Sequence, residues 1–152
     1  MIIGPEGVDD PGVRDLFDAA DAYGLSIYPP ENYHALDRDE FRRDDVTLLV
    51  ARDDSGAALG MAALVEQADG YGELKRMYVH DAARGRGIGA ALLDAVEALA
   101  AGLGIRTLRL ETGEPQAAAI ALYGRAGYLR TAPFGEYVDD PTSICMERSL
   151  VE

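Results

Sequence analysis

The stretch that decides the fold is ELKRMYVHDAARGRGIGAALL, residues 73 to 93. It begins as a strand-like run that ends at Val79, passes through a turn with glycines at positions 85, 87 and 89, and ends in apolar residues at helical spacing. Such a turn lets backbone N–H groups approach an anion, and the N-terminus of the following helix adds partial positive charge. The stretch therefore predicts an anion-binding turn between a strand and a helix.

The charge distribution points to the same turn. The chain has a net charge of −13, yet residues 75 to 86 carry four cations against one aspartate, a net charge of +3. A basic island in an acidic protein indicates an anionic ligand, although a solvated charged loop has the same composition. The acidic remainder argues against a nucleic-acid partner, because a surface that neutralises phosphates needs clustered Lys and Arg.

Length and composition predict one globular domain over residues 1–152, since 152 residues with 48% hydrophobic content suit a single core. No apolar run reaches the ~20 residues that span a bilayer, and the stretch MIIGPEGVDDPG lacks the features of a signal peptide. We therefore expect a cytoplasmic protein with no membrane partner. One cysteine, Cys145, and two histidines, His34 and His80, disfavour a disulfide framework and a metal site.

The remaining pattern predicts a mixed α/β order. Asp10 is expected to cap a helix that Gly24 ends, and residues 37–43 to form a short helix. Three strand-like runs between residues 46 and 79 predict an antiparallel meander. The fold class expected is α/β, a mixed and mostly antiparallel sheet of about seven strands flanked by about four helices. The later elements are a helix closed by Gly102 and Gly104, a strand at 106–112, a helix at 115–127, and strands at 128–131 and 143–150. The apolar stripe expected on the first of these helices is Ile88, Leu92, Val96, Leu99 and Leu103.

Two other phosphate-binding turns fit the glycines less well. A P-loop needs Lys followed by Ser or Thr, and Ile88-Gly89-Ala90 stands there instead. The dinucleotide fingerprint G-x-G-x-x-G/A matches Gly85 to Ala90, with Glu111 as the ribose-binding acid. However, HDAAR separates this turn from a strand that carries charges, and one βαβ unit cannot supply both mononucleotide halves.

Two motifs resemble the GNAT (Gcn5-related) N-acetyltransferases, over about Val46 to Leu150. The first is similar to the family's acetyl-CoA signature, Arg or Gln, two residues, Gly, one residue, Gly or Ala, which falls on Arg84, Gly87 and Gly89. The second, QAAAIALYGRAGY, resembles the family's helix motif N-x-x-A-x-x-L-Y-x-x-x-G-F. It matches at Ala119, Leu122, Tyr123 and Gly127 and departs at Gln116 and Tyr128.

The resemblance implies an acyltransferase that uses acetyl-CoA as cosubstrate and acetylates a primary amine of a small molecule or peptide by direct attack. A noncatalytic acetyl-CoA-binding module is the alternative. The family is also compatible with a homodimer. The first 45 residues carry little of the signature, so the acceptor stays open, and the loops YPPENYH (28–34) and FGEYVDDP (134–141) are the expected acceptor-facing segments.

The same resemblance assigns the cosubstrate site. Residues 73–79 resemble the family's fourth strand, which is splayed from the fifth so that pantetheine lies between them, while the glycine turn holds the pyrophosphate. A merely structural turn and ordinary strand packing are the alternatives. The residues expected to bind acetyl-CoA are Met77, Tyr78, Val79, Arg84, Gly85, Arg86, Gly87, Ile88, Gly89, Ala90 and Gln116.

Glu73 and Tyr123 are the expected catalytic residues. Glu73 has the spacing at which histone-acetylating members place a general base, acting directly or through water; an exposed strand carboxylate paired with Lys75 is the alternative. Tyr123 matches the family's general acid toward the thioester sulfur, and its alternative is an aromatic packed on the sheet. Glu111 or water are the other candidates for the base. Cys145 lies in a strand pattern typical of a core residue, which favours transfer without an acetyl-cysteine.

Overall fold

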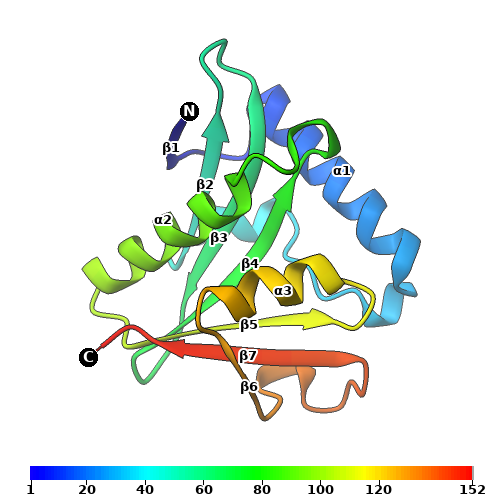
Figure 1. Cartoon of the computed structure of the whole chain (residues 1–152), viewed down its shortest axis with the longest axis vertical. Coiled ribbons are helices and arrows are strands. Elements are labelled where there is room, and N and C mark those ends of the chain that lie inside the picture. Colours follow the sequence, from blue (N-terminus) through cyan, green and yellow to red (C-terminus); the bar gives the residue numbers. More distant parts are fainter. Residues whose placement is uncertain (152) are drawn as a thin grey trace.

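Seven strands form one sheet in the order β1-β2-β3-β4-β5-β7-β6 (Figure 1). The computed structural model describes residues 1–151, and the sheet confirms the expected α/β class. The strands are β1 (Ile2–Pro5), β2 (Val46–Arg52), β3 (Ala58–Glu66), β4 (Tyr71–Val79), β5 (Thr107–Gly113), β6 (Leu129–Thr131) and β7 (Ser143–Ser149). The helices in this range are α1 (Pro11–Ile27), α2 (Ile88–Gly102) and α3 (Ala117–Arg125), with short 3-10 helices at Pro30–Asn32, Asp39–Arg42, Asp81–Ala83 and Gly135–Tyr137.

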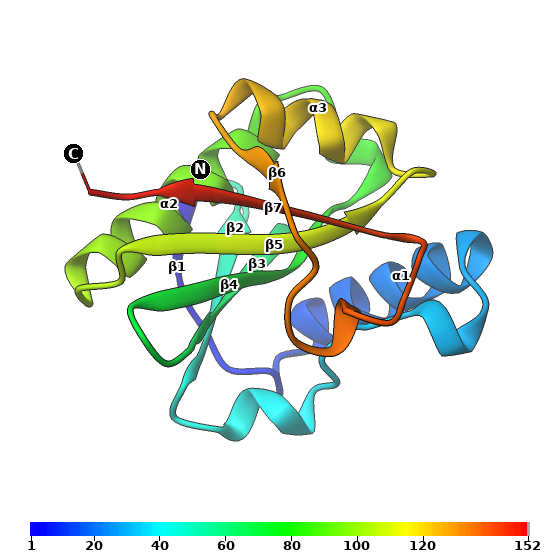
Figure 2. The same ribbon diagram turned by 90° about the horizontal axis from the view of Figure 1, so that it is seen from below.

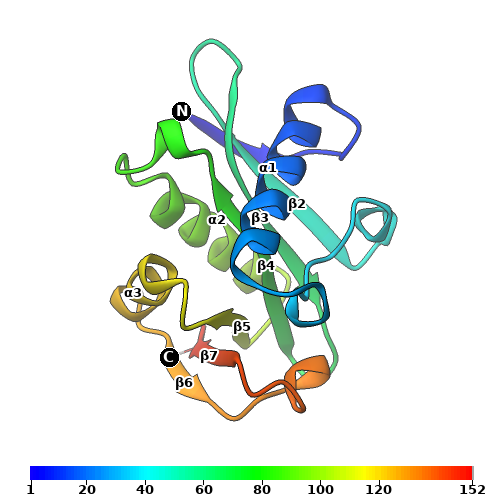
Figure 3. The same ribbon diagram turned by 90° about the vertical axis from the view of Figure 1, so that its right-hand side faces the viewer.

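The helices cover both faces of the sheet, as Figure 3 shows with α1 on one side and α2 and α3 on the other. Alternation along β3 explains the two layers, because successive side chains of a strand point to opposite faces. Met61 and Ala63 pack with α1, whereas Ala62 and Leu64 pack with α2. None of the helices in residues 1–151 is long and apolar enough to cross a membrane.

The sheet splits between β4 and β5. These strands pair in parallel only from Tyr71–Leu74 to Thr107–Leu110, and then diverge (Figures 1 and 2). β4 stays paired with β3 on its other side, across a bulge. At this bulge Arg76 has φ of 58° and the pairing register shifts between Met61 and Ala63. β5 instead stays paired with β7 along its whole length. The splay implied by the family resemblance is therefore present, and one edge of β4 has no strand partner within the described chain from Lys75 onward.

Three expectations about the helices need correction. α1 does not end at Gly24 but continues to Ile27, because Gly24 is buried under the ring of Tyr33, where a Cβ would overlap that ring. The short helix expected at 37–43 is the 3-10 helix Asp39–Arg42, so residues 1–151 hold three α-helices rather than about four. Leu103, expected on the apolar stripe of α2, lies beyond the helix end and is 49% exposed.

Candidate active site

One cavity of about 640 Å³ joins the glycine turn to the two loops that the sequence marked as acceptor-facing. It passes through the gap between the diverging halves of β4 and β5, and α3 forms a further wall. At one end lie residues of the turn and of the α2 N-terminus. At the other end the cavity is lined by Tyr28, Asn32, Tyr33, His34, Lys75, Glu111 and Tyr137.

The predicted turn between a strand and a helix is present, and two of its glycines have positive φ. Gly85 and Gly87 have φ of +80° and +77°, a region that side-chain-bearing residues rarely adopt, and an added Cβ at either would meet open space. Gly89 instead lets α3 approach α2, because its Cβ position lies 3.4 Å from a Leu122 methyl carbon. The open glycines leave room for a ligand against the main chain at the start of α2.

The two arginines of the turn are placed differently. Arg84 lines the cavity, forms an ion pair with Asp81 at 2.9 Å, and donates from Nε to the Val79 carbonyl at 3.2 Å. Arg86 does not line the cavity, and its guanidinium donates to the Ala82 carbonyl at 3.4 Å. Gly85, Gly87, Ile88, Gly89 and Ala90 all line the cavity. Among the expected turn residues, Arg86 is thus the one that reaches a ligand only by moving its side chain.

The middle of the cavity brings together the strand and helix residues of the two motifs. Met77, Tyr78 and Val79 line it from β4, and Gln116 and Tyr123 line it from the start and the middle of α3. Gln116 Nε2 donates to the Tyr28 hydroxyl at 3.0 Å, which ties the α3 N-terminus to the acceptor-side loop. Tyr28 in turn lies so close to Gly113 that no Cβ fits there.

Tyr123 is 5% exposed and its ring packs edge-on against that of Tyr128. Within residues 1–151 no side chain or main-chain group hydrogen-bonds its hydroxyl. Burial raises the pKa of Tyr123, because the charged phenolate is poorly solvated there, so the hydroxyl keeps its proton near neutral pH. A protonated phenol on a cavity wall has the form that a general acid needs.

Glu73 is buried, and both of its carboxylate oxygens accept hydrogen bonds. It is 6% exposed, accepts from Gln67 Nε2 at 2.9 Å and from the Tyr137 hydroxyl at 2.6 Å, and lies 3.6 Å from Lys75 Nζ. Lys75 Nζ also donates to the Tyr137 hydroxyl at 2.7 Å. The pairing with Lys75 is present, but the carboxylate is buried rather than exposed as that alternative expected, and Glu73 itself does not line the cavity. It reaches the cavity wall only through Tyr137 and Lys75.

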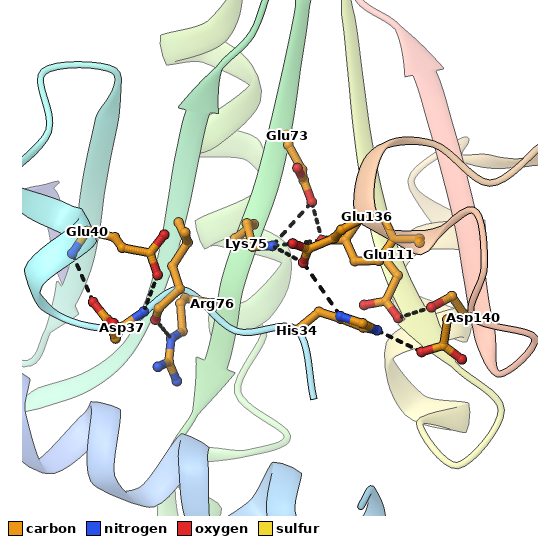
Figure 4. Close-up of polar contacts among 12 residues, drawn as sticks. His34, Asp37, Glu40, Glu73, Lys75, Arg76, Glu111, Glu136 and Asp140 are labelled. Atoms are coloured by element: carbon orange, nitrogen blue, oxygen red, sulfur yellow. Dashed lines mark hydrogen bonds and ion pairs between the residues drawn. The ribbon is translucent and has the colours of Figure 1, made fainter. Parts of the chain in front are cut away.

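Glu111 lies across the gap on β5 and lines the cavity directly. Figure 4 shows its carboxylate on the side of His34 and Asp140, apart from Glu73. Burial raises the pKa of Glu111 from 4.5 to about 7, although the Ser143 hydroxyl donates to it at 2.8 Å and His34 and Lys75 favour its charge. Glu111 therefore exchanges a proton near neutral pH inside the cavity.

The two loops meet through a polar network at the end of the cavity that His34 and Tyr137 line (Figure 4). His34 Nε2 lies 2.7 Å from Asp140 Oδ2, and His34 Nδ1 lies 3.6 Å from Glu136 Oε1, which in turn is 3.6 Å from Lys75 Nζ. Hydrogen bonds from Thr142, His34 and Asn32 lower the pKa of Asp140, which keeps it ionised. Both segments thus line the cavity where the sequence indicated.

Tyr137 is a cavity residue that sequence reasoning did not single out. It is 2% exposed, its hydroxyl bridges Glu73 and Lys75, and its ring packs edge-on against that of His34 at 5.2 Å between centroids. Burial and the Glu73 carboxylate raise its pKa, so it stays a phenol. Its loop was marked as acceptor-facing, but no local pattern distinguishes it from Phe134 in the same loop.

The fold and cavity define a class of protein. A split sheet, a glycine turn with an open main chain at one end of a cavity and titratable groups at the other end suit an enzyme that brings a long phosphorylated cosubstrate to a second substrate. The model of the acetyltransferase (GNAT) family matches residues 13–128. The chain is also 42% identical over 139 residues to an IAA acetyltransferase of Azospirillum brasilense, covering 91% of this chain and 90% of that protein. The chain therefore belongs to the GNAT acetyltransferase family, and the resemblance is confirmed.

Solved structures agree with the assignment. A protein of Klebsiella pneumoniae assigned as an acyl-CoA N-acyltransferase is 38% identical, with a TM-score of 0.81 over 99% of this chain and 97% of that one. A GNAT family acetyltransferase of Elizabethkingia anophelis, solved with acetyl-CoA bound, is 20% identical, with a TM-score of 0.73 over 97% of both chains. The second likeness shows the shared fold alone.

Proposed function

We propose that this protein uses acetyl-CoA to acetylate the primary amine of a small molecule or peptide by direct attack. The observation that carries the proposal is the continuous cavity, which joins an anion-binding turn to a cluster of titratable side chains through the gap in the sheet. A long cosubstrate with phosphates at one end and a reactive group at the other fits that shape. The family's known members, including one solved with acetyl-CoA, support this choice.

The proposed cosubstrate site follows the cavity. The amides of residues 84–90 hold the pyrophosphate, where Gly85 and Gly87 leave the main chain uncovered, and Arg84 adds charge. The free edge of β4 from Met77 to Val79 offers main-chain groups to the pantetheine arm, in place of the hydrogen bonds that β5 no longer supplies. Gln116 fixes the opposite wall through Tyr28.

The proposed chemistry needs a base and an acid on opposite sides of the thioester. A base takes one proton from the ammonium, and the amine nitrogen then forms a bond to the acetyl carbon as the carbon–sulfur bond breaks. An acid protonates the leaving sulfur, and the second proton that the nitrogen loses after attack restores the acid. Tyr123 is the proposed acid, because its hydroxyl is protonated, lines the cavity and has no partner within residues 1–151. Cys145 is 3% exposed in β7, and burial raises the pKa of its thiol, which supports transfer without an acetyl-cysteine.

Of the two candidate bases, Glu111 fits better than Glu73. Glu111 lines the cavity and its pKa of about 7 is matched to taking a proton near neutral pH. Glu73 is separated from the cavity by Tyr137, and both of its oxygens accept hydrogen bonds. We propose Glu111 as the base that the amine meets, and Glu73 as the group that holds Lys75 and Tyr137 in the cavity wall.

An assay of thiol release tests the proposal. The protein is incubated with acetyl-CoA and a panel of primary amines, small peptides included, and free CoA is followed with a thiol-reactive dye. Mass spectrometry of the same reactions identifies which amine gains an acetyl group. Amine-dependent CoA release with an acetylated product supports the proposal. Tight acetyl-CoA binding without transfer to any amine of the panel points to the noncatalytic binding module instead.

A further inference from the structure

Thr112 holds a buried hydroxyl that nothing in residues 1–151 satisfies. The residue is 3% exposed, and its Oγ1 has no hydrogen-bond partner in the described chain. Among the side-chain nitrogen and oxygen atoms that are fully buried within residues 1–151, Oγ1 of Thr112 is the only one without a hydrogen-bond partner. Native proteins pair most buried polar atoms, because leaving one without a partner costs stability. Folding therefore does not explain the hydroxyl at this position, and a contact outside the described chain does.

The position of Thr112 in β5 shows where that contact lies. Leu108 and Leu110 precede it on the same face of the strand, which packs into the core beneath α2 and α3, so an apolar residue such as Val suits that face better. Pairing of β5 with β4 ends at Leu110, so Thr112 stands just beyond the split. It lines the cavity, as does Tyr123. The hydroxyl thus replaces an apolar side chain at the point where the core face becomes the cavity wall.

We propose that the Thr112 hydroxyl donates a hydrogen bond to the acyl-pantetheine arm of acetyl-CoA, to a carbonyl oxygen of either its amides or its thioester. The inference rests on the proposed function, since the ligand is the same cosubstrate. Oγ1 has almost no exposed surface in this structure, so the Thr112 side chain turns toward the gap when the arm enters it. The hydroxyl then donates one hydrogen bond to the arm. Thr112 acts here as a positioning residue beside the proposed acid, Tyr123.

Thr112→Val tests the inference because valine keeps the shape and removes only the hydroxyl. Thr112→Ser retains the hydroxyl, and Thr107→Val makes the same exchange on β5 at a position that does not line the cavity. Urea unfolding without ligand is measured first. We expect Thr112→Val to unfold at the same or a higher urea concentration than wild type, because no internal hydrogen bond is lost and a buried polar group is removed.

Calorimetric titration with acetyl-CoA and with CoA follows. We expect Thr112→Val to weaken acetyl-CoA binding by about 5- to 10-fold, the effect of one neutral hydrogen bond, while Thr112→Ser and Thr107→Val bind like wild type. Equal weakening for CoA places the contact on a pantetheine amide, and weakening for acetyl-CoA alone places it on the thioester; both results support the inference.

Two results overturn it. In the first, Thr112→Val binds both ligands as tightly as wild type. In the second, the ligand-free variant is destabilised relative to Thr107→Val, which assigns the hydroxyl to an internal contact. Wild-type protein that binds neither ligand removes the proposed function itself, so the two failures are told apart by the wild-type titration.

Discussion

Replacing Glu111 by Gln removes a buried ionisable group and keeps its shape. In the folded chain burial raises the pKa of Glu111 from 4.5 to about 7, against the hydrogen bond from Ser143 and the charges of His34 and Lys75, while Asp140 adds to the rise. Between these two pH values the folded protein keeps a proton that the unfolded chain has released. The free energy of unfolding therefore falls as pH rises through this range, and the loss is complete above the folded pKa.

The size of the effect follows from the two pKa values. The difference between 4.5 and about 7 corresponds to a loss of about 3 kcal/mol as an upper bound, at about 1.4 kcal/mol for each tenfold change in proton affinity. Glutamine carries no charge at either pH and can still accept from Ser143. Urea unfolding should therefore show a higher free energy of unfolding for Glu111→Gln than for wild type at pH 8, and no such difference at pH 5.

The same variant tests the proposed role in catalysis. If Glu111 takes the ammonium proton, wild-type kcat falls as the pH is lowered, with a midpoint near 7. Glu111→Gln should lack this acidic limb of the pH–rate profile, and its kcat should be about 10²- to 10⁴-fold lower. Glu73→Gln serves as the matched comparison and should retain the limb. The reasoning is refuted if Glu111→Gln shows the same stability relative to wild type at both pH values, or if Glu73→Gln alone loses the limb.

Two further substitutions probe the proposed acid, Tyr123, and the packing of Gly24 in α1 against Tyr33. Tyr123→Phe should lower kcat by about 10²-fold and leave acetyl-CoA affinity unchanged, because proton donation matters only as the carbon–sulfur bond breaks; steady-state kinetics with a thiol dye checks it, and wild-type turnover makes Tyr123 a packing residue. Gly24→Ala should destabilise the fold by about 1–3 kcal/mol, because its Cβ overlaps the Tyr33 ring. The control Gly102→Ala has open space at its Cβ and should not destabilise; equal urea midpoints for the two contradict the close packing at Gly24.

The glycine turn was predictable because its information is local. Glycines between a strand pattern and a helix pattern indicate a turn, and Gly85 and Gly87 supply the positive φ from which that turn is built. The splay of β4 from β5 was different, since it came only from the family resemblance. Strand patterns show which residues alternate between the two faces, but not where two parallel strands stop pairing. The gap between β4 and β5 could therefore not be predicted from the sequence of either strand.

The end of the cavity away from the glycine turn was less predictable because its contacts are long-range. Tyr137 and Glu73 are 64 residues apart in sequence, and their hydrogen bond decides that Glu73 faces a tyrosine rather than the cavity. The raised pKa of Glu111 likewise depends on burial in the assembled cavity. Gly24 illustrates the same limit in the fold: a glycine near a helix end predicts termination, whereas here it makes room for Tyr33 from a later loop.

Calorimetric titration of wild type, Gly87→Glu and Gly104→Glu with acetyl-CoA tests the central claim most directly. Gly87 and Gly104 share positive φ, +77° and +80°, and open space at the Cβ position, so both variants carry similar backbone strain, but only Gly87 lines the cavity. Circular dichroism first verifies that both variants fold. The account predicts that wild type and Gly104→Glu bind alike, while Gly87→Glu loses more than about tenfold in affinity because a carboxylate stands where the pyrophosphate should lie. Equal binding by Gly87→Glu and Gly104→Glu would contradict the placement of acetyl-CoA on this turn.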